Sequence, residues 1–119
     1  MSSLQTYYLR ISFTTAFLLL YSLVGLFAQN AYGYISKGNE YAKAFDNEKA
    51  LKEYMQAYET DSSNCTALWK IAEAHINLGE EADKIIQTQH YYLAEKWARR
   101  ALALCPDTAN AHFFVVGAL

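Results

Sequence analysis

The sequence predicts an all-α protein in which about two and a half antiparallel helix pairs follow an N-terminal hydrophobic helix. Three observations favour this fold class: an apolar run near the N-terminus, a recurring pattern of alanines and aromatic residues, and a content of one proline and five glycines. Hydrophobic residues make up 53% of the chain and charged residues 18%, which is typical of a folded helical domain and not of a disordered segment.

Residues 1–28 have the composition of an export signal. Arg10 is the only charged side chain in this segment, and residues 11–28 are uncharged and rich in Phe, Leu, Val and Ala. The run ends at Ala28 and a polar Gln-Asn pair follows, so we expect cleavage near this point. An uncleaved membrane anchor is the alternative, since about 18 apolar residues are close to the length that spans a bilayer. Either interpretation places the remaining chain outside the cytoplasm, as a periplasmic, secreted or membrane-anchored protein.

The remaining chain, residues 29–119, begins with a helix pair between residues 31 and 64. Small and aromatic side chains recur along both helices at the spacing of one helical face. They are Tyr34, Gly38 and Tyr41 in the first helix and Ala50, Tyr54 and Ala57 in the second. Small residues at the crossing points let two helices approach closely, and aromatic residues fill the space beside them. Asn64 or Ser63 is expected to cap the next helix.

A second helix pair begins at Cys65 and repeats the pattern with an insertion. Its first helix carries Leu68, Ala72 and His75, and its second carries Ala94, Ala98 and Ala101. We expect the inserted residues 80–90 to form a loop that leads into a lengthened helix ending near Leu104. Pro106 then prevents this helix from continuing. A third unit starts at Asn110 and is expected to be incomplete, because the sequence reaches only Leu119.

These residues resemble the tetratricopeptide family, whose repeat of about 34 residues places small and aromatic residues at the same spacings. With Ala31 as position 1, Gly38 falls at position 8 and Tyr54 at position 24. Further segments look like the regulator-of-microtubule-dynamics-like branch and its exported bacterial relatives: Leu-Trp-Lys at 68–70, Tyr-Tyr at 91–92, Pro-Asp at 106–107 and Ala-His-Phe at 111–113. The resemblance implies a tetratricopeptide-like α-α superhelix over residues 29–119. It does not imply a microtubule role, because function depends on surface residues and not on the fold.

The resemblance also implies a partner-binding groove, because the first helix of each tetratricopeptide pair lines the concave surface. The residues carried over to this groove are Ile35, Asn39, Lys43, Trp69, Glu73, Asn77 and Phe113. Their mixed aromatic and amide character suits an extended peptide or a partner helix. For Trp69 and Phe113, packing between neighbouring helices is the alternative. Some family members grip a C-terminal carboxylate with Lys and Asn, but Ile35 and Glu73 replace those residues and argue against such a clamp.

Charge and residue chemistry exclude several function classes. The chain has 10 basic and 12 acidic residues, a net charge of −2 and no basic stripe, so we do not expect a nucleic-acid partner. The histidines His75, His90 and His112 form no helix-spaced pair with one another or with a cysteine, so we expect no metal site. No nucleophile–base pair or phosphate-binding glycine loop is evident, and we therefore expect neither an enzyme nor a bound cofactor.

Cys65 and Cys105 are a possible disulfide pair. Cys65 begins one helix of the second pair and Cys105 ends the antiparallel partner, so the hairpin brings both to the same end. A disulfide closing a loop of about 40 residues stabilises a fold by about 3 to 4 kcal/mol in the chain-entropy model. The alternative is two free thiols whose Cα atoms lie more than about 7 Å apart.

From these features we expect an exported scaffold or adaptor that binds a protein or peptide partner in a shallow groove. The alternative function is a structural capping segment of a longer helical solenoid with no ligand of its own, which the incomplete third unit favours. Contact with a membrane is expected only through residues 1–28, and only if this segment stays uncleaved.

Overall fold

Four α-helices make up the computed structural model, which describes residues 2–107. They are α1 (Ser2–Lys43), α2 (Asn47–Thr60), α3 (Cys65–Glu81) and α4 (Lys84–Leu104). No strand occurs in this part of the chain, so the predicted all-α class is confirmed for it. The third unit predicted from Asn110 to Leu119 lies outside the described residues.

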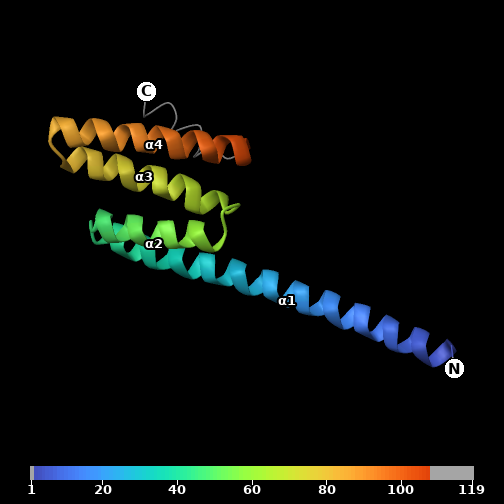
Figure 1. Cartoon of the computed structure of the whole chain (residues 1–119). Helices are drawn as coiled ribbons and strands as arrows, with labels where there is room; N and C mark the ends of the chain where they lie inside the picture. The colour runs from blue at the N-terminus through green and yellow to red at the C-terminus, as the bar shows by residue number, and fades with distance from the viewer. Residues whose placement is uncertain (1, 108–119) are drawn as a thin grey trace.

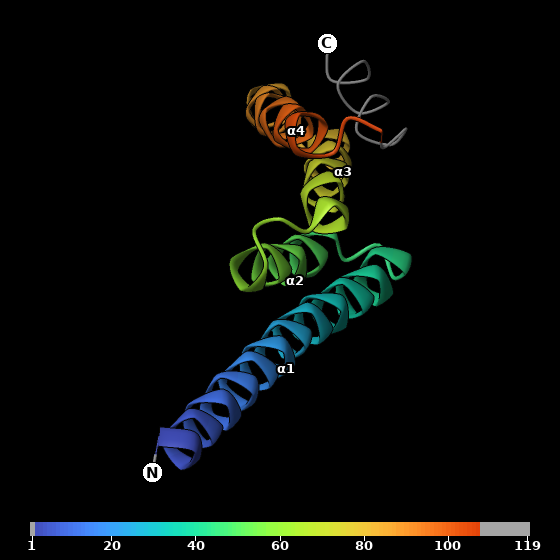
Figure 2. The same ribbon diagram turned by 90° about the vertical axis from the view of Figure 1, so that its right-hand side faces the viewer.

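Helix α1 is one uninterrupted helix of 42 residues. Its C-terminal part packs against α2, whereas its N-terminal part projects away from the other helices (Figures 1 and 2). Residues 2–23 are all exposed, including Phe17 and Leu20, whereas Ala31 is fully buried. The helix continues through the boundary predicted at residue 28. No helix within the described range is both long and apolar enough to span a membrane.

The turn between α1 and α2 is closed by local hydrogen bonds. Phe45 adopts a left-handed backbone conformation with a φ of 59°, which is a position that glycine usually occupies. The backbone N–H of Asp46 donates to the carbonyl of Tyr41 at 2.9 Å, which satisfies a carbonyl at the end of α1. The Asp46 side chain then accepts from the N–H of Lys49 and caps α2. The chain therefore reverses within three residues, and α2 packs back along α1 (Figure 2).

The crossing of α1 and α2 uses the small residues that the repeat pattern predicts. Ala50 and Ala57 are fully buried, and Tyr54 between them is 1% exposed. A Cβ atom added at Gly38 would contact the Tyr54 ring, with Cδ1 at 2.6 Å. The absence of a side chain at Gly38 therefore allows the Tyr54 ring to lie directly against the backbone of α1.

Gly38→Ala is expected to lower the free energy of unfolding by about 1 to 2 kcal/mol. The added methyl group overlaps a buried ring that cannot move into solvent, and this cost exceeds the gain in helix propensity of about 1 kcal/mol. Gly33→Ala is the matched control, because a Cβ atom added at Gly33 would have nothing within 4 Å. Urea denaturation followed by circular dichroism should show Gly33→Ala unchanged or more stable. Equal stability of the two variants would contradict this packing.

The second hairpin differs from its predicted form at the insertion. Helix α3 continues to Glu81 and α4 already begins at Lys84, so the loop predicted over residues 80–90 is wrong. Asp83 explains the early start of α4, because its carboxylate accepts from the N–H groups of Ile85 and Ile86. The predicted cap at Asn64 is confirmed by a bond from the Ala67 N–H at 3.1 Å, and the predicted end of α4 at Leu104 is also confirmed.

The two hairpins form one continuous stack in which α1, α2, α3 and α4 follow one another in order (Figure 1). Ala50 and Tyr54 of α2 share a cluster with Ile71 and Ala74 of α3, which joins the first hairpin to the second. Ala94, Ala98 and Ala101 are buried in α4, and Ala101 packs with Leu68 of α3. The surfaces of α1 and α3 that lie beside this core form the candidate site.

Candidate partner-binding groove

A shallow hollow of about 400 Å³ lies between the C-terminal part of α1 and helix α3. Its lining residues are Asn39, Ala42 and Lys43 from α1 and Lys70, Glu73 and Asn77 from α3. Residues spaced three or four apart share one face of a helix, which is why each set faces the same hollow. The structure thus brings together four of the predicted groove residues: Asn39, Lys43, Glu73 and Asn77.

Tyr54 of α2 fixes the position of Asn39 from behind the groove. The Tyr54 hydroxyl donates to Oδ1 of Asn39 at 2.8 Å. Burial raises the pKa of Tyr54 to about 12, with a further contribution from the nearby Glu73 carboxylate. The hydroxyl therefore keeps its proton at neutral pH and acts as the donor. Asn39 is held by this bond, so its amide presents a fixed orientation to the groove.

The charges in the groove are unequally paired. Lys70 Nζ lies 2.9 Å from Oε2 of Glu73, so these two charges largely neutralise each other. Lys70 Nζ also lies 4.5 Å from the centroid of the Trp69 ring, a favourable cation–π distance. Lys43 forms no ion pair within residues 2–107. The groove therefore carries one uncompensated positive charge, at Lys43.

Side-chain hydrogen bonds among Asn47, Asn77 and Glu81 connect α2 to α3 beside the groove. Asn47 is 6% exposed at the start of α2, and its amide donates to Oε1 of Glu81 at 2.6 Å. The Asn77 amide donates to Oδ1 of Asn47 at a longer 3.5 Å. These bonds link α2 to the last turns of α3, and no described residue donates to Oδ1 of Asn77.

The remaining predicted groove residues lie elsewhere. Ile35 is only 5% exposed and packs in the core with Ala57 and Ala67, because its position on α1 faces α2 and α3 and not the hollow. Trp69 is half-buried and packs against the cluster of Leu68 and Ala101. Phe113 lies outside the described residues.

Comparison with protein families identifies the region that contains this groove. The family described as Regulator of microtubule dynamics protein 1-3 matches residues 34–117. The chain belongs to this family. The match begins inside α1 and includes every residue that lines the groove. No curated protein matches the chain.

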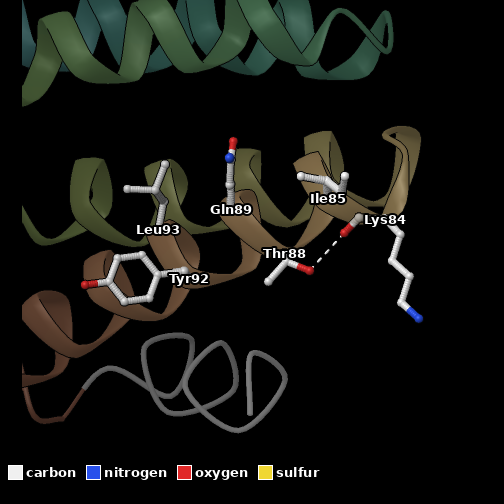
Figure 3. A pocket seen from close by; sticks show the side chains of 6 residues that line it. All are labelled: Lys84, Ile85, Thr88, Gln89, Tyr92 and Leu93. Atoms are coloured by element: carbon white, nitrogen blue, oxygen red, sulfur yellow. Dashed lines mark hydrogen bonds between the residues drawn. The ribbon is translucent and has the colours of Figure 1, made fainter.

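A second hollow in this family member lies on the outer surface of α4 and is mainly apolar (Figure 3). It has a volume of about 860 Å³ and is lined by Lys84, Ile85, Thr88, Gln89, Tyr92 and Leu93. Ile85 is 74% exposed and Tyr92 is 67% exposed. Large apolar side chains with this much exposure are typical of surfaces that pack against another element.

A pair of histidines joins α3 to α4 in the same Regulator of microtubule dynamics protein 1-3 region. Nδ1 of His75 lies 3.1 Å from Nδ1 of His90, and His75 is 7% exposed. Burial lowers the pKa of His75 to about 4, with a further contribution from the proximity of His90. At this distance one Nδ1 donates a hydrogen bond to the other, so the two Nδ1 atoms cannot both carry a hydrogen.

Sequence reasoning missed this pair because the two residues are 15 positions apart on different helices. Their contact depends on the length of α3 and on the early start of α4, both of which differ from the predicted loop. The pair could have been found from the sequence only with the turn placed at residues 82–83, because His75 and His90 are equally far from that turn on the two antiparallel helices. Within residues 2–107, no three His, Cys, Asp or Glu side chains form a group that could hold a metal ion.

A disulfide links Cys65 to Cys105 at the open end of the second hairpin. The two Cα atoms are 6.2 Å apart, which is within the range that a disulfide bridges. Cys65 is the first residue of α3, and Cys105 caps the end of α4 by donating its backbone N–H to Ala101. The bond therefore closes the hairpin opposite the loop at residues 82–83.

Proposed function

We propose that this chain is an exported, non-enzymatic scaffold that binds a protein or peptide partner in the groove between α1 and α3. The observation that carries the proposal is the gathering of Asn39, Lys43, Glu73 and Asn77 around one hollow. These side chains offer hydrogen-bond donors, acceptors and charge on a rigid helical support. A site of this kind suits recognition of a polymer backbone better than it suits covalent chemistry.

We also propose that the helices form a tetratricopeptide-like superhelix. The spacing of Gly38, Ala50 and Ala57 supports this assignment, as does the burial of the two alanines at the crossing of α1 and α2. In such a superhelix α1 and α3 are the first helices of successive pairs, and their exposed faces form the concave surface. The groove lies on that surface.

Export is proposed from residues 1–28. The uncharged apolar run after Arg10 and the exposure of residues 2–23 support a segment that is not part of the helical core. Removal of this segment near Ala28 would leave Ala31, a fully buried residue of α1, in the mature chain. A periplasmic or secreted location follows from this proposal.

A structural role within a longer solenoid is the second candidate function. The apolar hollow on α4 favours it, because Ile85 and Tyr92 are exposed where a following helix of a solenoid would pack (Figure 3). Under this alternative the groove has no ligand of its own.

Selection from a random linear peptide library displayed on phage, with the full chain as bait, tests the proposed function. Asn77→Ala is expected to weaken the binding of selected peptides about fivefold, because it removes about one hydrogen bond worth about 1 kcal/mol. Asn77 is preferred to Asn39 for this test, since truncating Asn77 loses only the long 3.5 Å contact to Asn47, whereas truncating Asn39 would remove the 2.8 Å acceptor of the Tyr54 hydroxyl. Fluorescence anisotropy with one selected peptide measures the change.

Lys52→Ala is the matched control, because Lys52 is an exposed residue of α2 that does not line the groove. It is expected to bind the selected peptide as the wild type does, and both variants should keep the wild-type circular dichroism spectrum. Failure of the wild type to retain any peptide would reject the proposed function and favour the structural alternative.

A further inference from the structure

The bond from Tyr54 determines which part of the Asn39 amide is free. Oδ1 of Asn39 already accepts the Tyr54 hydroxyl at 2.8 Å, whereas no described residue accepts a bond from its Nδ2. Every buried side-chain nitrogen and oxygen in the described range has a partner, so this free Nδ2 is accessible to solvent. Asn39 therefore offers the groove a hydrogen-bond donor that fits a carbonyl oxygen.

Asn77, on helix α3 across the groove, offers a hydrogen-bond acceptor. Its Nδ2 is directed to Oδ1 of Asn47, and no described residue donates to its own Oδ1. Asn77 therefore offers the groove an acceptor that fits a peptide N–H. One donor and one acceptor on the walls of the same hollow match the two polar groups of a peptide unit.

The donor of Asn39 and the acceptor of Asn77 distinguish between the two ligands expected for the groove, an extended peptide and a partner helix. A helical partner uses its backbone N–H and C=O groups internally, so it has few left for Asn39 and Asn77. An extended segment has both groups free along its length. The amide geometry therefore favours an extended peptide.

Charge selects among extended peptides. Lys70 is already paired with Glu73 at 2.9 Å, but Lys43 at the end of α1 has no acidic partner among residues 2–107. A basic side chain on the ligand would be repelled at Lys43, and an acidic one would be attracted.

We infer that the groove takes an extended peptide with its backbone bonded to Asn39 and Asn77 and an acidic side chain placed against Lys43. This inference rests on the proposed function, and it adds the conformation of the ligand and the chemistry of one of its side chains. The acid is an internal Asp or Glu, in agreement with the absence of a carboxylate clamp at Ile35 and Glu73.

Lys43→Glu tests the inference in the same phage-displayed library of random linear peptides. The wild type is expected to enrich peptides that carry Asp or Glu, and Lys43→Glu is expected to replace them by peptides that carry Lys or Arg. A selected acidic peptide should bind Lys43→Glu about tenfold more weakly than the wild type, because one attraction becomes a repulsion. Replacing the acid of that peptide by its amide should weaken binding to the wild type but not to Lys43→Glu.

Lys52→Glu is the matched control, because it makes the same change in net charge at an exposed position of α2 away from the groove. It should enrich the same acidic peptides as the wild type. Peptide binding without acidic enrichment, or equal enrichment by Lys43→Glu, would overturn the inference and leave the proposed function intact. Absence of any retained peptide would instead reject the proposed function itself.

Discussion

Lowering the pH from 7 to 4 is expected to reduce the free energy of unfolding by about 3 kcal/mol through the titration of His75. Burial against the core, together with His90, lowers the pKa of His75 from 6.5 to about 4 in the folded chain. The unfolded chain gains a proton near pH 6.5, whereas the folded chain resists it until about pH 4. Between these values the unfolded state binds more protons, so stability falls as the pH falls and the loss is complete below about pH 4.

Urea denaturation at several pH values, followed by circular dichroism, measures this dependence. His75→Phe is the control variant, because it keeps a ring of similar size at position 75 and removes the titrating group. Its stability should change less than that of the wild type between pH 6.5 and pH 4. Parallel curves for the two proteins would show that His75 does not cause the dependence.

The part of this fold that the sequence predicts best depends on residues close together in the chain. Ala50, Tyr54 and Ala57 lie on one face of a single helix, so their spacing alone predicts that they are buried together. The cap at Asn64 is similarly local, because its carboxamide reaches only the next turn. Such features need no knowledge of how the helices are arranged.

The loop and the histidine pair could not be predicted because they depend on the alignment of two helices. Gly79 directly precedes the predicted loop at residues 80–90, but it lies inside α3, where an added Cβ atom would meet Cδ1 of Tyr91 at 2.9 Å. A glycine required for close helix packing has the same sequence signature as a glycine that ends a helix. Only the facing helix, with Tyr91 and His90 next to Gly79, distinguishes the two.

The residues of the candidate groove could also be predicted only in part. Asn39 and Lys43 are four residues apart on α1, and both line the hollow. Ile35 is another four residues back, yet it is buried. A straight helix has 3.6 residues per turn, so a row at spacing four drifts around the helix, and packing at one end differs from packing at the other. Repeat position alone therefore could not assign Ile35.

Removing the disulfide is expected to lower the free energy of unfolding by about 4 kcal/mol, the largest single effect predicted for this chain. Cys65 and Cys105 are 40 positions apart, and the entropy that a cross-link removes from the unfolded chain grows with the length of the closed loop. A small domain is stable by only about 5 to 15 kcal/mol in total, so this loss would raise the unfolded population strongly. Urea denaturation of the double variant Cys65→Ser/Cys105→Ser against the oxidised wild type measures it.

The effect of a reductant separates the covalent bond from the packing of the two side chains. Reduction should bring the wild type close to the stability of the double variant, and the same reductant should leave the double variant unchanged, because that protein has no bond to break. The second hairpin should be affected first, since the bond joins the start of α3 to the end of α4, where Leu68 and Ala101 pack. Mass spectrometry without reductant that finds two free thiols in chain purified from an oxidising compartment would refute the bond and remove the basis for this prediction.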